Sequence, residues 1–377
     1  MRMADSSAGS ILRAVLELGP APRSVIARHA ALSPATLTWQ ARSLIEAGLL
    51  RELPETTGAG IGRPYSPLEL DTDGNVALGL HIAARQSTVS AVDIGGRIVR
   101  RTQIPHRSLD PSDILDDAVT HVRALAAEFT EVRILGLGVA TGGWVDTVDG
   151  TVVHHSFLGW RDVPVRQVLA DGTGLSTQLD NHTRALAHAE QLFGRTRGAA
   201  SSIVLFVGNV IDAAFAVHGQ VHYGPRSAAG SIARLLGPGE SPDGTTRLLR
   251  DYTDHALLAA AGPPVADVAA LLAAAVPGTA AHERFLDRAA VLGEVIAALI
   301  DLLDPDAVVI ADRAFDLPGV GPAYLDAVRS RSVVCARPEE VVFASSFPGR
   351  ILTMSSAAVV LHGIFHAPHT ALAARVI

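Results

Sequence analysis

The fold of the first part of the chain is decided by the segment LSPATLTWQARSLIEAGLLRE, residues Leu32–Glu52. Ser33 is a residue type that caps helix N-termini, and Pro34 suits the first helical position. The apolar side chains that follow recur at helical spacing: Leu37, Ala41, Leu44 and Ile45. Gly48 suits the C-cap that ends the helix, and Leu49–Leu53 has the composition of a strand. The segment therefore predicts a helix followed by a short strand.

The residues on either side of this segment complete a winged helix-turn-helix pattern. Upstream, apolar residues at helical spacing predict a helix around Ile11–Leu16 and a shorter one around Val25–Ala30. Downstream, a glycine-rich loop (Thr56–Arg63) leads to a second short strand at Pro67–Leu70. Three helices and a two-stranded wing predict an N-terminal DNA-binding domain over residues 1–75.

The second helix of a helix-turn-helix enters the major groove, so its outward face predicts the DNA contacts. With the apolar side turned inward, the outward residues are predicted to be Thr36, Thr38, Trp39, Gln40 and Arg42. Gln pairs with adenine and Arg with guanine, while Thr contacts a thymine methyl group or a phosphate. Arg63, in the Gly-Arg-Pro of the wing loop, suits a narrow minor groove.

Two alternatives stay open for this domain. It could be a helical bundle that packs on the rest of the chain without touching DNA, because a fold does not fix a function. Trp39 could cap the core of its own domain instead of facing DNA.

The remainder of the chain has the pattern of a duplicated α/β unit. A three-stranded meander over 76–103 is followed by a helix around 112–129 and an apolar strand around 134–140. A similar order recurs, with a meander over 202–223, a helix around 285–303 and a strand around 307–311. We therefore expect two related lobes, residues 76–182 and 183–377, with a ligand cleft between them. A C-terminal helix, about 353–377, is expected to pack back on the first lobe.

Composition restricts the class of protein. Hydrophobic residues make up 48% of the 377 and charged residues 18%, which predicts packed domains, not disorder. The net charge is −7, so any DNA contact must come from a local patch. No apolar run is long enough for a membrane span, no signal-peptide core is present, and Cys335 is the sole cysteine. These features favour the cytoplasm. The chain has no lysine, which excludes a Walker-type phosphate loop.

At this point the sequence resembles the ROK family, named for repressor, open reading frame and kinase. Leu32–Glu52 with the Gly-Arg-Pro is similar to the N-terminal domain of the family's repressors, which its kinases usually lack. Further matches cover nearly the whole chain: VALGLHIA at Val76, LGLGVATGGWVD at Leu135, FLGWRDVPV at Phe157, LDNHTRALAHAE at Leu179 and AAGSIARLLG at Ala228. The resemblance implies a two-lobed, actin-like (ribonuclease H-like duplicated) sugar-kinase fold.

The kinase motifs that the resemblance implies are altered here. The first phosphate loop, D-I-G-G-T in the family, is His81–Arg85, and the second, G-T-G-I-G, is Gly208–Asp212. The adenosine-side glycine run is replaced by Ala311–Arg313. The E-N-D motif that supplies the catalytic base is Asp180, Asn181, His182. Because phosphoryl transfer depends on positioned phosphates and metal, we expect no catalytic residue and no kinase activity, although His182 could in principle act as a base.

The family's zinc site is altered as well. The A-G-E-I-G-H stretch becomes Ala229–Arg234, and the cysteine-rich run becomes a segment without cysteine around Ser241–Asp254. Zinc needs three or four nitrogen or sulfur ligands, so we expect no metal and no cofactor.

The sugar-binding positions of the family carry over to a candidate effector site: Gly142, Gly143, Ser156, Asn181, His182, Ser231 and Arg234. The acidic groups of the kinases are absent, while an arginine and a histidine have appeared. An arginine pairs with phosphate or carboxylate, so we expect a sugar or an anionic sugar derivative, bound by Arg234 and Asn181. The alternative is that Arg234 forms a structural ion pair with an acid such as Asp212.

Together these observations predict a transcriptional regulator, more often a repressor in this family, with a non-catalytic effector-sensing body. We expect a homodimer on an inverted repeat of double-stranded DNA. One alternative is a sugar kinase with an attached DNA-binding domain. Another is a DNA-bound scaffold that has lost ligand binding.

Overall fold

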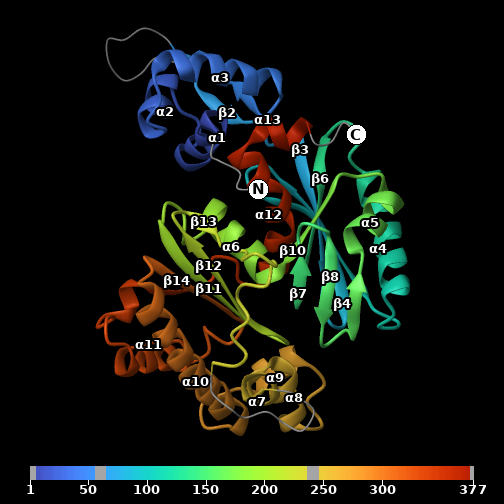
Figure 1. Cartoon of the computed structure of the whole chain (residues 1–377), viewed down its shortest axis with the longest axis vertical. Helices are drawn as coiled ribbons and strands as arrows, with labels where there is room; N and C mark the ends of the chain where they lie inside the picture. The colour runs from blue at the N-terminus through green and yellow to red at the C-terminus, as the bar shows by residue number, and fades with distance from the viewer. Residues whose placement is uncertain (1–5, 56–64, 236–245, 374–377) are drawn as a thin grey trace.

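The computed structural model describes residues 6–55, 65–235 and 246–373 of the chain. Figure 1 shows a helical N-terminal domain at one end of an elongated molecule, above two α/β lobes. Within the described residues, no helix is both long and apolar enough to cross a membrane.

The N-terminal domain has the predicted winged helix-turn-helix order. Its elements are α1 (Ser7–Leu18), α2 (Arg23–His29), α3 (Pro34–Glu46), β1 (Leu50–Glu52) and β2 (Leu68–Leu70). Ser33 caps α3, its Oγ accepting the Thr36 amide at 3.1 Å. Gly48 follows the helix end with φ +63°, the left-handed conformation that glycine adopts without strain. β1 and β2 pair antiparallel as the two strands of the wing. The fold of this domain is therefore confirmed.

The first lobe is built on a five-stranded sheet with the order β10-β6-β3-β4-β5. A meander of three antiparallel strands begins it: β3 (Asn75–Ile82), β4 (Gln86–Asp93) and β5 (Ile98–Pro105). β6 (Arg133–Thr141) and β10 (Thr177–Asn181) then add parallel to the β3 edge. Helices α4 (Pro111–Ala126) and α5 (Val165–Thr173) share an apolar core with one face of this sheet.

The second lobe repeats this topology, with the order β13-β12-β11-β14-β15. Its meander is β11 (Ser201–Val207), β12 (Ile211–Val217) and β13 (Gln220–Val221). The strands β14 (Ala307–Asp312) and β15 (Val342–Ala344) add in parallel, and α10 (Ala280–Leu303) packs with α11 (Val320–Arg331) on one face. The same strand order in both lobes confirms the predicted duplication.

Several elements were not predicted from the sequence. Three short strands form a separate sheet: β7 (Trp144–Asp146), β8 (Thr151–His155) and β9 (Trp160–Val163). Helices α7 (Arg247–Tyr252), α8 (Asp254–Ala261) and α9 (Val268–Ala274) lie at the far end of the second lobe from the N-terminal domain (Figure 1). Strands of three to five residues and helices of six to eight carry too little periodicity to stand out.

Helix α12 (Ile351–His366) runs through the centre of the molecule, beside α6 (His182–Phe193) and against the β3 and β6 strands of the first lobe (Figure 1). Two strand glycines allow this close approach. A Cβ on Gly138 would lie 2.1 Å from the Ser356 carbonyl oxygen, and one on Gly79 would lie 2.5 Å from the Ser356 hydroxyl. The helix therefore contacts the sheet backbone almost directly.

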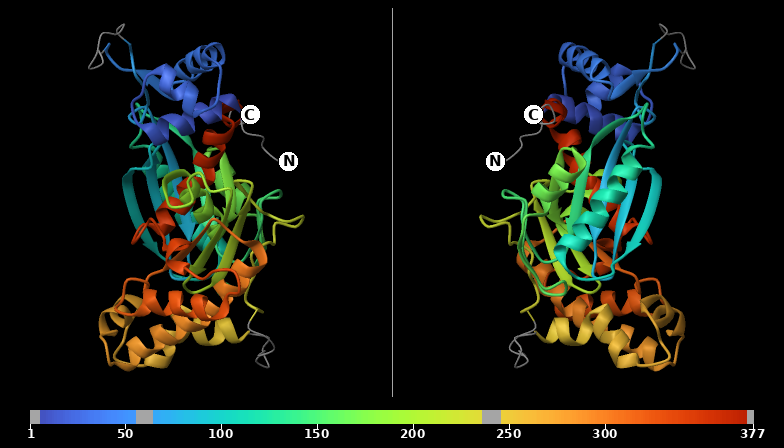
Figure 2. Two further views of the ribbon diagram at one scale, coloured as in Figure 1. Left: turned by 90° about the vertical axis from the view of Figure 1, so that its left-hand side faces the viewer. Right: turned by 90° about the vertical axis from the view of Figure 1, so that its right-hand side faces the viewer.

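The C-terminal end of α12 holds the start of α1. The carbonyl of His366 accepts hydrogen bonds from the amide and the hydroxyl of Ser6, at 3.0 and 2.9 Å. The carbonyl of Phe365 accepts one from the Arg13 guanidinium at 2.8 Å. The last carbonyls of a helix lack partners within it, so α1 satisfies them. The short helix α13 (Pro368–Ala373) follows beside the N-terminal domain (Figure 2).

We expect Gly9→Ala to destabilise this junction. A Gly-to-Ala change inside a helix normally stabilises the helix by about 0.5–1 kcal/mol. Here the new Cβ would lie 2.3 Å from the His366 oxygen, and overpacking costs about 1–3 kcal/mol. Hydrogen exchange of the α1 amides measures the loss. Ser10→Ala, the next position in α1, is the control and should change stability by less than about 0.5 kcal/mol; slower exchange in Gly9→Ala would contradict the expectation.

Candidate functional site

The outward face of α3 carries three of the predicted DNA-contacting residues. Leu37, Ala41 and Leu44 are buried in the domain core. Thr38, Trp39 and Arg42 are exposed, and Trp39 is 68% exposed. The guanidinium of Arg42 pairs with Glu46 one turn along, at 2.9 Å. The exposure of Trp39 favours an external contact over the alternative in which it caps the core.

The other three predicted DNA contacts are placed differently. Thr36 is half-buried, and its hydroxyl lies 2.8 Å from the Ser33 hydroxyl at the helix start. Gln40 is also half-buried, and its Oε1 atom is buried without a hydrogen-bond partner among the described residues. The expectation that both point outward is therefore corrected, because each lies beside the buried stripe of α3. Arg63 lies outside the described residues.

The position of α3 leaves its exposed face accessible. Figures 1 and 2 place α3 at the outer end of the molecule, while α1 faces the two lobes. Near its end, α3 approaches the C-terminal segment, where the Ser43 hydroxyl is 3.4 Å from the His369 ring. Nothing among the described residues covers Trp39 and Arg42, so a long ligand such as duplex DNA can reach them.

A second set of predicted residues meets at the carboxyl ends of parallel strands, where ligands commonly bind in α/β folds. β6 runs into Gly142 and Gly143, and β10 ends at Asn181, which pairs in register with Thr141. The Asn181 amide donates to the Gly143 carbonyl at 2.8 Å, and its oxygen caps α6 by accepting the Thr183 amide at 2.8 Å. The structure thus brings together Gly142, Gly143, Asn181 and His182.

Three histidine rings gather near Gly142: His155 and His182 lie beside it, and His81 lies against His182; only His182 was predicted. His81 is stacked on His182 with ring centroids 5.7 Å apart, and the Phe206 ring lies tilted against His182 at 4.1 Å. A Cβ on Gly142 would lie 3.2 Å from the His155 ring. Burial lowers the pKa of His81 to about 3 and of His155 to about 4, and it holds the pKa of His182 well below its usual range. Near neutral pH these three rings are uncharged.

A buried polar network continues from the E-N-D position into α6. The Asp180 carboxylate accepts hydrogen bonds from the Arg184 guanidinium and the Tyr223 hydroxyl, each at 2.8 Å. The single proton of the Tyr223 hydroxyl is donated to Asp180, so the Tyr223 oxygen accepts a hydrogen bond from the His188 ring at 2.8 Å. The His188 ring stacks on His362 of α12 at 3.7 Å. The network that begins at Asp180 therefore reaches α12, the helix whose end binds α1.

The remaining candidate ligand residues lie at the surface. Ser156 is exposed in the turn between β8 and β9, and Ser231 and Arg234 are exposed beyond Gly230. Asp212 is half-buried, and burial raises its pKa to about 6. A hydrogen bond with Asn181 and the charge of Arg184 act in the opposite direction and lower the pKa. The anion site formed by Arg234 and Asn181 stays a prediction, and both ends of the Asn181 side chain already have partners within the protein.

The segments matching the nucleotide motifs contain a buried ion-pair network that the sequence did not reveal. Arg288 of α10 is fully buried and donates to Asp254 at 2.8 Å and to Asp312 at 2.6 Å. The hydroxyl of Tyr324 donates to the second oxygen of Asp312 at 2.8 Å. The Asp254 amide donates to the carbonyl of Gly208, in the second phosphate loop. Both carboxylates of this network therefore bind the Arg288 guanidinium.

Comparisons with known proteins agree with this architecture. The sequence model of the ROK family matches residues 77–236. A transcriptional regulator of Mycobacterium tuberculosis strain H37Rv is 35% identical over 397 residues, covering 99% of this chain and 89% of the relative. The DNA-binding transcriptional repressor Mlc of Escherichia coli K12 is 23% identical over 386 residues, covering 96% and 94%.

Solved structures share the fold. A ROK family transcriptional regulator, a homologue of the E. coli Mlc protein, superposes with a TM-score of 0.78 at 22% identity, covering 95% of this chain and 96% of that one. A ROK glucokinase from Streptomyces griseus superposes with a TM-score of 0.63 at 22% identity, covering 75% of this chain and 98% of that one. The chain therefore belongs to the ROK family and is one of its transcriptional regulators.

Proposed function

We propose that the chain represses transcription in the cytoplasm by binding, as a homodimer, an inverted repeat through α3 of each copy. The observation that carries this proposal is the exposure of Thr38, Trp39 and Arg42 on α3, the helix at the outer end of the molecule (Figure 1). Arg63, by its place in the wing sequence, would contact an adjacent minor groove. Each dimer would then read two half-sites whose spacing is fixed by the dimer geometry.

Selection of genomic fragments by the full chain tests this proposal. We expect recovery of fragments that share an inverted repeat, with affinity falling steeply as salt concentration rises. Sedimentation of the protein–DNA complex should give two copies of the chain for each duplex. Failure to enrich any sequence, or one copy bound to a single half-site, would contradict it.

We also propose that the two lobes sense a ligand without phosphorylating it. His182 stands at the position of the catalytic base, but its side chain is buried and lies against the rings of His81 and Phe206. Arg288, Asp254 and Asp312 bind one another where the kinase motifs would serve a nucleotide. An ATP-dependent assay with common hexoses should give no turnover. Turnover abolished by His182→Ala would overturn this part of the proposal.

The effector would lie at the carboxyl ends of β6 and β10, beside Gly142, Gly143, Asn181 and His182, with Ser156, Ser231 and Arg234 at the rim. The retained Gly-Gly loop supports a polar ligand, and the exposed guanidinium of Arg234 supports an anionic one. Calorimetry with neutral sugars and sugar acids, on wild type and Arg234→Ala, separates these classes. Tighter binding of neutral sugars, or no loss in the variant, would contradict an anionic effector.

A further inference from the structure

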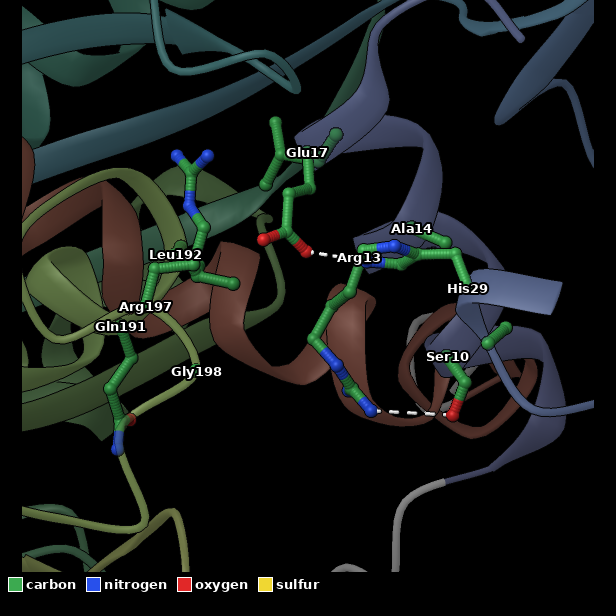
Figure 3. Close-up of a pocket in the computed structure, with 11 residues that line it drawn as sticks. Ser10, Arg13, Ala14, Glu17, His29, Gln191, Leu192, Arg197 and Gly198 are labelled. Carbon is green, nitrogen blue, oxygen red and sulfur yellow. Dashed lines mark hydrogen bonds and ion pairs between the residues drawn. The ribbon is translucent and has the colours of Figure 1, made fainter. Parts of the chain in front are cut away.

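A cavity of about 270 Å³ lies between the N-terminal domain and the second lobe. Figure 3 shows its two walls. Ser10, Arg13, Glu17 and His29 of α1 and α2 form one side, and Gln191 and Leu192 of α6 with Arg197 of the following turn form the other. Ligands commonly bind where two domains meet. This cavity is separate from the strand ends at Asn181, because none of its lining residues belongs to β6 or β10.

The charges lining the cavity favour an anion. Glu17 is already paired with His29, whose Nε2 atom lies 2.7 Å from its carboxylate (Figure 3). Arg13 is fixed by hydrogen bonds to the Phe365 carbonyl and, at 3.4 Å, to the Ser10 hydroxyl. Arg197 is exposed, and its guanidinium has no partner among the described residues. Arg13 and Arg197 thus line the cavity from opposite domains, and Glu17, already hydrogen-bonded to His29, is the one carboxylate among the described lining residues.

Uncharged groups complete the lining. Ser10 and Gln191 offer a hydroxyl and an amide, and the Gln191 Oε1 atom is buried without a hydrogen-bond partner among the described residues. Ala14, Leu16 and Leu192 add an apolar side. Such a lining suits a small molecule with one anionic group and a short, partly apolar body.

We propose that this cavity is a second ligand site, which binds a small organic anion between Arg13 of the N-terminal domain and Arg197 of the second lobe. The ligand would contact both domains at once, so it would favour the docked orientation of the N-terminal domain over any other. Arg13 also holds the end of α12, so ligand binding and the α12–α1 junction would reinforce each other. This second site is distinct from the proposed effector site at Asn181. Ligand binding in the cavity does not depend on the proposed regulator function, but any effect of that ligand on DNA binding does.

The test uses the full chain with glycerol 3-phosphate as the probe and glycerol as its uncharged match, at constant ionic strength. We expect calorimetry to detect glycerol 3-phosphate and not glycerol. Arg197→Gln should weaken binding at least tenfold, since it removes a charged hydrogen bond. Arg107→Gln, an exposed arginine in the loop before α4, is the matched control and should bind like wild type. Arg234→Ala, at the rim of the Asn181 site, should also bind like wild type.

Each other outcome contradicts the proposal. Loss of binding in Arg234→Ala but not in Arg197→Gln would place the anion at the Asn181 site, which supports the proposed effector site and overturns the second one. Equal loss in Arg107→Gln would indicate a nonspecific charge effect. No binding to wild type, or equal binding of glycerol, would also overturn it. A hydrogen-exchange measurement should show slower exchange in both α1 and the end of α6 when the probe is bound; protection of neither would argue against a ligand bridging the domains.

Discussion

Arg42→Ala should weaken binding to the selected operator by at least about 30-fold. An arginine bound to a guanine edge contributes about 1–3 kcal/mol, and a dimer on an inverted repeat loses two such contacts. The loss should concentrate on one base position in each half-site, while a phosphate contact would weaken all sequences equally. Trp39→Ala should add to the loss, because its exposed ring lies on the same face of α3.

The neighbouring Glu46 supplies a matched control for this measurement. Glu46→Gln removes the carboxylate that pairs with Arg42 and takes a negative charge away from the DNA-facing helix. It should bind operator as tightly as wild type or more tightly. Fluorescence anisotropy with a labelled operator at two salt concentrations measures both variants. Wild-type affinity in Arg42→Ala would exclude α3 as the reading helix in the orientation proposed.

Acidification from pH 7 to pH 5 should lower the free energy of unfolding by about 4–5 kcal/mol. Burial lowers the pKa of His81 to about 3 and of His155 and His188 to about 4. The unfolded chain takes up protons below about pH 6.5, whereas the folded protein keeps these rings neutral. Stability is therefore lost as pH falls from about 6.5 toward 4, by about 2 kcal/mol for each ring at pH 5. Asp212 offsets about 1 kcal/mol of this loss in stability. Its pKa is raised to about 6 in the folded protein, so the folded state takes up this proton at a higher pH than the unfolded chain does.

Urea unfolding at the two pH values and constant ionic strength measures this loss. His81→Phe keeps a stacked ring against His182 but cannot titrate, so the difference between the two pH values should shrink by about 2 kcal/mol. His222→Phe, at an exposed position after β13, should leave the difference unchanged. Equal stability of the wild type at both pH values would show that the histidines do not remain neutral in the folded protein.

The sequence predicted the elements whose signals are local. Ser33 and Pro34 marked the start of α3, and Gly48 its end, because capping chemistry involves residues only a few positions apart. The meanders were visible through strand composition and turn glycines. Gln40 was predicted to point outward but is half-buried, since a residue at the edge of the apolar stripe can lie on either side of it.

The histidine cluster could not be predicted because strand register creates it. His81 pairs with Ala140 in β6, and Asp180 pairs with the same residue from β10. Residues 81, 155 and 182 are distant in sequence, and they meet only where β3, β6 and β10 end together. The ion pairs of Arg288 are hidden for the same reason, since its partners come from α8 and the end of β14. Arg288 follows Asp287 in a helix that carries other charged residues, so nothing in the local sequence marks it as buried.

The junction between α1 and α12 has a consequence for how the protein is made. Chains emerge from the ribosome N-terminus first, and domains tend to fold in that order. α1 is among the first helices to emerge, but the carbonyls of Phe365 and His366 that hold it are synthesised more than 340 residues later. During nearly all of synthesis the DNA-reading domain can fold but cannot dock. A nascent chain therefore presents α3 on an untethered domain, and α1 docks only after Phe365 and His366 have been synthesised.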